Sequence, residues 1–321
     1  MTLATSPMTK PLILFSHDGG VDDYLSILLL MSMEHIHVSG ISVTPADCYI
    51  EPAVSATRKI LDLMGRSDVS VAASTVRGVN SFPRQFRRAS FSIDLFPILN
   101  ERETIATPLA PPRAGQADED GQHFIARKLR EAPTPVTVLE TGPLTTLAEA
   151  IDLDPAIESK IERLVWMGGA LNVPGNIYPV IEGGQDVSAE WNVYWDPFAA
   201  ERIWKTKIPI VMCPLDITNN VSITRDFVLR LARQRRYPCS DVAGLCYSLV
   251  MSQIYYMWDV LTTGYIGRPD LFTLKEWETE IVTTGPSQGR TKVTPGGRKV
   301  LAMDTVDKEA FLEYVLQQWA R

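Results

Sequence analysis

Short apolar runs alternate with helical patterns along the first part of the chain. Residues 12–15 form an apolar run with the length of a buried strand, and residues 24–31 are typical of an apolar helix. Further along, a strand is predicted at 37–44, an amphipathic helix at 51–64 and a short strand at 69–73. Because strands and helices alternate in this order, the pattern predicts a parallel sheet.

The same alternation continues toward the C-terminus. Buried strands are predicted at 135–139, 161–167 and 208–212, helices at 121–131, 147–151, 198–204, 224–236, 243–256 and 308–319, and paired strands at 279–284 and 299–303. The predicted fold class is therefore α/β, with an open, mostly parallel Rossmann-like sheet flanked by helices. We expect one catalytic domain at 11–321, preceded by a flexible tail at 1–10.

Composition narrows the choice of partners. Hydrophobic residues make up 45% of the chain and charged residues 21%, as is ordinary for a globular enzyme. The net charge of −7 argues against nucleic acid as the main partner, because phosphate binding needs a basic face.

The first apolar run is too short for a signal peptide or a membrane span. The four cysteines lack CxxC spacing, which is typical of free thiols in a reducing compartment. We therefore expect a cytoplasmic protein that does not bind a membrane.

Three carboxylates crowd the turn after the first predicted strand. Asp18, Asp22 and Asp23 stand where open α/β sheets bind ligands, with a Gly-Gly pair between them. One Asp at a helix start would indicate only a cap. Three acids repel one another, and a hard cation bound through oxygen makes them compatible. Asp47 follows the second strand and should point into the same crevice, so the turn predicts a metal or sugar site.

Arginine and phenylalanine are interspersed in the irregular stretch at 77–99. Loops of this length inside a compact domain are usually lids or binding loops. The mixture could suggest RNA binding, but the acidic balance of the chain favours a packed, solvated face. The residues concerned are Arg77, Phe82, Arg84, Phe86, Arg87, Arg88 and Phe91.

Five motifs occur in one order along most of residues 11–272. They are DGGVDD at 18–23, TGPLTTLA at 141–148, WMGGALNVPGN at 166–176, AEWNVYWDP at 189–197 and WD at 258–259. Any one of these motifs is a weak signal, but together they are specific. In this order and spacing the chain resembles the nucleoside hydrolases, the inosine–uridine-preferring nucleoside N-ribohydrolase family.

The resemblance implies Ca²⁺-dependent hydrolysis of the N-glycosidic bond of ribonucleosides, giving free base and ribose. It implies one Ca²⁺ bound by Asp18, Asp23, Asp259 and the carbonyl of Thr141, with Asp18 as the base that deprotonates the attacking water. Residues at the family's sugar-binding positions are Asp22, Asp47, Asn176, Glu190 and Asn192. The resemblance also implies a small-molecule nucleoside substrate and a homo-oligomer, a dimer or a tetramer.

The chain departs from the family pattern at several positions. Ser16 replaces a first Asp, Asp47 replaces an Asn, and Trp258 replaces the His that protonates the leaving base. The family's His-Gly loop is not evident in residues 77–99. Trp258 is then a candidate for stacking on the base, which favours purine nucleosides over uridine. Two alternatives stay open: a catalytically impaired ribose- or nucleoside-binding protein, and a hydrolase of a related ribosyl substrate.

Overall fold

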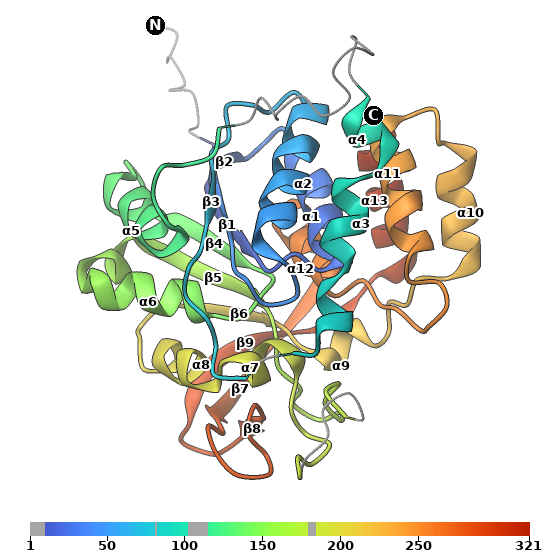
Figure 1. The fold of residues 1–321 in the computed structure, drawn as a ribbon. Helices are drawn as coiled ribbons and strands as arrows, with labels where there is room; N and C mark the ends of the chain where they lie inside the picture. The colour runs from blue at the N-terminus through green and yellow to red at the C-terminus, as the bar shows by residue number, and fades with distance from the viewer. Residues whose placement is uncertain (1–9, 81, 102–114, 179–183) are drawn as a thin grey trace, which may run out of the picture.

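The computed structural model describes residues 10–80, 82–101, 115–178 and 184–321. Within them the strands form one nine-stranded sheet with the order β3-β2-β1-β4-β5-β6-β9-β7-β8 (Figure 1). Neighbours from β3 to β9 in this order are parallel, and β7 is antiparallel to both β9 and β8. The strands are β1 (Leu12–His17), β2 (His37–Val43), β3 (Val71–Ala73), β4 (Val136–Glu140), β5 (Ile161–Met167), β6 (Ile210–Cys213), β7 (Phe272–Ile281), β8 (Thr291–Val293) and β9 (Arg298–Val306). The predicted α/β class with an open, mostly parallel sheet is confirmed.

Helices cover both faces of this sheet (Figure 1). One face carries α1 (Val21–Met31), α2 (Ile50–Leu63), α11 (Pro238–Ser248), α12 (Trp258–Gly267) and α13 (Lys308–Trp319). The other face carries α5 (Gly121–Glu131), α6 (Thr145–Leu153) and α8 (Pro197–Trp204). Smaller helices are α3 (Ala89–Asp94), α4 (Pro97–Asn100), α7 (Trp191–Trp195), α9 (Leu215–Thr218) and α10 (Arg225–Arg233).

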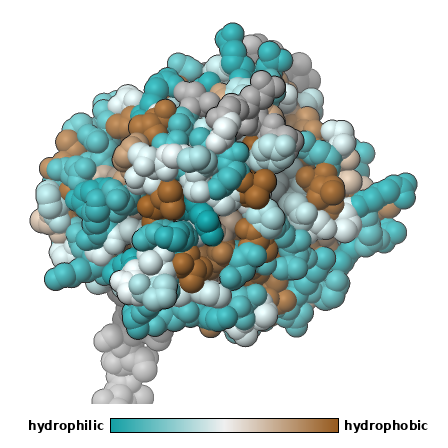
Figure 2. All heavy atoms as spheres, turned by 90° about the horizontal axis from the view of Figure 1, so that it is seen from below, coloured by the Kyte–Doolittle hydropathy of each residue, from teal (hydrophilic) through white to brown (hydrophobic). Residues whose placement is uncertain are grey.

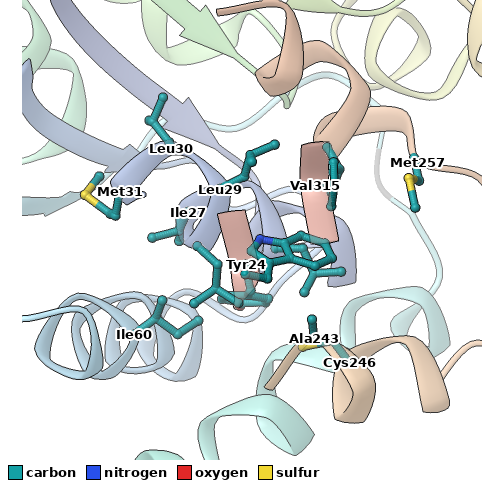
Figure 3. Close-up of a cluster of buried hydrophobic side chains, with 14 of the residues drawn as sticks. Tyr24, Ile27, Leu29, Leu30, Met31, Ile60, Ala243, Cys246, Met257 and Val315 are labelled. Atoms are coloured by element: carbon teal, nitrogen blue, oxygen red, sulfur yellow. The ribbon is translucent and has the colours of Figure 1, made fainter. Parts of the chain in front are cut away.

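Helix α1 is the centre of the larger core. Every residue from Val21 to Met31 is buried, which explains why most positions after Asp22 and Asp23 are apolar. Figure 3 shows Ile27 and Leu29 of α1 in one cluster with Ile60 of α2 and Val315 of α13. Because a fully buried Leu or Ile contributes roughly 1.5–3 kcal/mol, this packing holds the N-terminus of α1 in place.

The sheet topology creates a crevice at the C-terminal end of β1. Strand β2 lies on one side of β1 and strand β4 on the other, so the chain leaves these strand ends in opposite directions. Ligands of open α/β sheets bind at such a switch point. The turns after β1, β2, β4 and β5 all reach this edge, where the sequence motifs lie.

The predicted helix at 243–256 is confirmed only for residues 243–248. Helix α11 instead begins at Pro238, where a proline fits the first helical turn, and ends at Ser248. Residues 255–256 are drawn into an extended pairing, because the Tyr255 carbonyl accepts a 2.8 Å bond from Ile223 N–H and Tyr256 bridges Ser222. The predicted paired strands near the C-terminus are confirmed as β7 and β9, although β7 begins earlier, at Phe272.

Some expectations concern the ends and the surface of the molecule. Residues 1–9 of the predicted tail lie outside the described residues. All four cysteines are free, as predicted, and all four are buried. No helix among the described residues is long and apolar enough to cross a membrane. Figure 2 shows apolar residues on the lower face in small groups separated by hydrophilic ones.

Candidate active site

Carboxylates from three segments converge at the N-terminus of α1. A methyl group built on Gly20 would lie 3.5 Å from Asp23 Oδ2, 3.6 Å from Asp22 Oδ1 and 3.9 Å from Asp47 Oδ2. The backbone N–H of Asp259, in the first turn of α12, donates a 3.1 Å bond to Asp22 Oδ2. The structure therefore brings together acids that are far apart in the sequence.

Gly19 allows the first turn to fold back on the loop after β2. Its φ of +80° lies in the left-handed region, which favours glycine. A Cβ at this position would lie only 2.5 Å from Cβ of Cys48. The N–H of Gly20 then donates a 2.8 Å bond to Asp23 Oδ2 and caps α1. This close approach explains why Asp47, next to Cys48, reaches the same crevice.

The turn after β4 packs directly against the turn after β1. The Thr141 hydroxyl donates a 2.5 Å bond to Asp23 Oδ1, and the Thr141 N–H donates a 3.0 Å bond to the carbonyl of Ser16. A Cβ on Gly142 would lie 2.8 Å from Cβ of Asp18. The Thr141–Gly142 turn therefore forms one wall of the carboxylate cluster.

Asn192 and Glu190 hold backbone groups around this wall. The Asn192 side-chain amide donates 3.0 Å bonds to the carbonyls of Thr141 and Met167, so both of its N–H groups are committed. Glu190 is fully buried and accepts bonds from the N–H groups of Gly169, Asn192 and Val193 as the N-cap of α7. The structure thus gives these two predicted sugar-binding residues a supporting task that the sequence did not reveal.

Trp191 connects Asp47 with Asn176. Its indole N–H donates a 2.7 Å bond to Asp47 Oδ1, and its backbone N–H donates a 2.8 Å bond to Asn176 Oδ1. The buried Phe82 ring stacks on Trp191 with 3.8 Å between the ring centroids. The Arg/Phe-rich stretch is thus packed against the site through Phe82.

The aromatic residues before α12 have separate contacts. The Tyr255 hydroxyl donates a 2.7 Å bond to Asp22 Oδ1, and its ring meets Trp258 edge-on at 4.7 Å between centroids. Trp258 is half-buried and packs against a small cluster that includes Met167 and Leu215. The bond from Tyr255 to Asp22 was not predicted from the sequence.

Burial and mutual repulsion raise the pKa values of four acids of the cluster. Burial raises the pKa of Asp22 to about 6 and that of Asp47 to about 8, and neighbouring carboxylates add to both shifts. The pKa values of Asp18 and Asp259 are raised for the same two reasons. His17, whose Nδ1 lies 4.0 Å from Asp23 Oδ2, does not offset this charge, because burial lowers its own pKa.

The oxygen atoms of this cluster fit a hard divalent cation. Asp18 is 4% exposed, and its buried Oδ2 has no hydrogen-bond partner. An unpartnered carboxylate oxygen among other carboxylates is the arrangement that a cation stabilises. Among the described residues, however, no three His, Cys, Asp or Glu side chains already form a metal-binding group. The predicted ligand set includes the Thr141 carbonyl, so it is not made of side chains alone.

One buried acid of the site was missed in the sequence. Glu140 ends β4 and is fully buried; its Oε1 accepts a 3.3 Å bond from the N–H of Gly142, and its Oε2 has no partner. Burial raises the pKa of Glu140, whereas the Ser16 hydroxyl and the Gly142 N–H lower it. The available signal was an acid at the end of an otherwise buried strand.

Comparison with known proteins shows the family to which the chain belongs. The model of the inosine-uridine preferring nucleoside hydrolases matches residues 13–313. The chain belongs to this family. It is therefore a nucleoside hydrolase, an enzyme that acts on the N-glycosidic bond of ribonucleosides, as the sequence motifs predicted.

Relatives align along the whole chain. The structure of an inosine-uridine preferring nucleoside hydrolase from Bacillus anthracis superposes with a TM-score of 0.89 at 42% identity, covering 97% of this chain and 99% of that one. A pyrimidine-specific ribonucleoside hydrolase of Shewanella woodyi is 28% identical over 97% of this chain and 98% of its own length. Uridine nucleosidase 1 of Arabidopsis thaliana is 26% identical over 94% of this chain and 91% of its own length.

A Gly142→Ala substitution should damage the active site of this nucleoside hydrolase. The added Cβ would displace Asp18, and misplacement by about 1 Å can cost roughly 100-fold in rate. We expect kcat/KM to fall about 10- to 100-fold in a ribose-release assay. Gly244→Ala is the control, because nothing lies within 4 Å of its Cβ and it stands in helix α11. Wild-type kcat/KM in Gly142→Ala would contradict the wall assignment.

The raised pKa values predict how stability depends on pH when metal is chelated. Unfolded carboxyl groups lose their protons near pH 4, whereas folded Asp47 holds its proton to about pH 8, so stability is lost as pH rises through that window. Asp47→Asn cannot ionise and should avoid this part of the loss. The melting temperature of Asp47→Asn, relative to wild type, should therefore rise between about pH 4 and pH 8. A difference that stays constant or falls over this range would refute the buried-acid reading.

Proposed function

We propose that this nucleoside hydrolase cleaves its substrate in a Ca²⁺-dependent reaction at the carboxylate cluster. The observation that carries the proposal is the buried, unpartnered Oδ2 of Asp18 among carboxylates that raise one another's pKa. Such a site attracts a cation strongly, because no cationic side chain offsets its charge within the contacts described above.

The proposed calcium ligands are Asp18, Asp23, Asp259 and the carbonyl of Thr141. Calcium takes oxygen ligands of these kinds in flexible geometry. The Thr141 carbonyl is fixed by the Asn192 amide, and Asp23 is fixed by the Thr141 hydroxyl. When bound, the ion would lower the pKa of a coordinated water.

Asp18 is the proposed general base. Its Oδ2 has no hydrogen-bond partner in the described residues, so it is available to accept a proton from water. Departure of the nucleobase builds positive charge on the ribose ring, as in other glycosyl transfers. The surrounding carboxylates would stabilise that charge, which is largest in the transition state.

We propose that Asp22 and Asp47 hold ribose hydroxyls. One oxygen of Asp47 is committed to Trp191, which leaves Oδ2 facing the cluster. Asp22 is oriented by Tyr255 and by the N–H of Asp259. Asn176, Glu190 and Asn192 would complete the sugar site, and their bonds to the backbone support that site by keeping its walls in place.

The leaving base presents a separate question. Trp258 carries no group that could protonate the base as an imidazole does, so we propose that it promotes cleavage by stacking. Its edge-on contact with Tyr255 and its half-buried position support a ring held at the margin of the site. The names of two relatives, a pyrimidine-specific hydrolase and a uridine nucleosidase, instead support a preference for pyrimidine nucleosides. The ratio of inosine to uridine turnover decides between the two preferences.

We also propose that the enzyme works in the cytoplasm as a homo-oligomer. Four free and buried thiols support a reducing compartment.

A nucleoside-binding protein without turnover, or a hydrolase of a related ribosyl substrate, would each give a different result in the first experiment below.

Purified protein should release ribose from common ribonucleosides, and a calcium chelator should abolish the release. Asp18→Asn should lose at least about 100-fold in kcat, because it removes both the base and a proposed ligand. Asp304→Asn, on the exposed side of β9, is the matched control and should keep wild-type activity. Ribose release that is insensitive to chelation would refute the calcium proposal. Nucleoside binding without any release would identify the non-catalytic alternative.

Trp258→Ala should selectively impair purine turnover. Stacking on an aromatic ring is worth about 0.5–1.5 kcal/mol beyond buried area, so kcat/KM for inosine should fall about 2- to 12-fold. Calcium affinity, measured by calorimetry, should be unchanged because Trp258 is not a proposed ligand. Faster cleavage of uridine than of inosine by wild type, or an unaltered inosine rate in Trp258→Ala, would assign Trp258 to packing alone.

A further inference from the structure

Glu140 is a buried acid for which hydrolysis, as described so far, has no task. It is 0% exposed at the C-terminal end of β4, a strand in which every residue is buried. Its Oε2 has no hydrogen-bond partner in the described residues. Burying such a group is costly, so a buried and unsatisfied carboxylate calls for a functional explanation.

Ser16 stands opposite Glu140 on the neighbouring strand. The register of the parallel pair β1–β4 places these two residues side by side. The Ser16 hydroxyl is also buried and without a hydrogen-bond partner, although it is near enough to lower the pKa of Glu140. Ser16 is the position where the motif departs from the acid that the family resemblance leads one to expect. The chain thus has a serine where an acid is expected on β1, and an acid directly across from it on β4.

Glu140 contacts the Thr141–Gly142 turn, which forms one wall of the carboxylate cluster. Its Oε1 accepts the 3.3 Å bond from the N–H of Gly142, and the following turn carries the Thr141 carbonyl. That turn has no spare room, since a Cβ on Gly142 would collide with Asp18. A shift of the Glu140 side chain would therefore move the turn relative to Asp18 and Asp23.

We propose that Glu140 is a positioning residue of the cation site. Its carboxylate holds the Thr141–Gly142 turn and supplies, from β4, the supporting acid that Ser16 does not supply from β1. The inference rests on the proposed calcium site and adds a residue that acts through the Thr141–Gly142 turn rather than by contact with the substrate. Groups that orient metal ligands in this way typically change metal affinity 10- to 100-fold when they are altered.

Calcium titration calorimetry of the full chain tests the assignment. Glu140→Gln keeps the shape and one acceptor oxygen but removes the acid, and it should weaken the calcium Kd about 10-fold or more. Glu162→Gln is the matched control, since Glu162 is an exposed glutamate on the adjacent strand β5 and should leave the Kd unchanged. Circular dichroism and thermal melting of each variant show whether it is folded.

A second variant tests the exchange between strands. The double substitution Ser16→Asp with Glu140→Gln returns the acid to β1 and should recover most of the lost calcium affinity. Glu140→Asp, which keeps the carboxylate, should bind calcium more tightly than Glu140→Gln and serves if the glutamine variant does not fold.

Each outcome decides between the two proposals. Wild-type affinity in Glu140→Gln would overturn the positioning role while leaving the proposed function intact. A double variant no better than Glu140→Gln would overturn the exchange with Ser16. Wild-type protein that releases ribose without binding calcium would instead overturn the proposed calcium site, and this inference with it.

Discussion

Burial of several carboxylates in one crevice is the constraint on which the active site depends. Asp18, Asp22 and Asp259 lose hydration and face like charges, and both effects raise their pKa values. The fold does not relieve this with a lysine or arginine ion pair at the cluster in the described residues. Hydroxyl and N–H donors satisfy some of the oxygen atoms, and at least one oxygen, Oδ2 of Asp18, stays free. The unfavourable electrostatics are therefore retained at the candidate site, where they would attract positive charge strongly.

The packing of α1 makes that arrangement possible. A helix buried on every side cannot shift away from the repulsion at its N-terminus, so apolar burial holds the acids at short range. The glycines of the first turn and of the turn after β4 then allow two backbones to approach more closely than any side chain would permit. Stability from the core is thereby used to maintain an electrostatically unfavourable site.

Sequence reasoning proposed this candidate site because its acids follow predicted strands. Asp18 and Asp47 could be placed at one edge of the sheet from strand ends alone, and the family motifs added Asp259, which lies far away in sequence. Contacts that depend on side-chain direction could not be predicted in this way. The indole N–H of Trp191 on Asp47 and the amide of Asn192 on Thr141 need the position of α7, which was not predicted as a helix. The bond from Tyr255 to Asp22 needs the end of α11 and the pairing with Ser222, where an apolar pattern wrongly favoured a longer helix.

The bond between Asp259 and Asp22 closes a loop of 237 residues. Contacts of such long sequence separation form late, because the entropy of closing the loop opposes them until the rest of the sheet has assembled. During synthesis, the N-terminal turn therefore leaves the ribosome long before Asp259, whose N–H binds Asp22, has been made. A chain that stops before α12 would contain six of the nine strands of the described sheet but would lack the Asp259 N–H that binds Asp22.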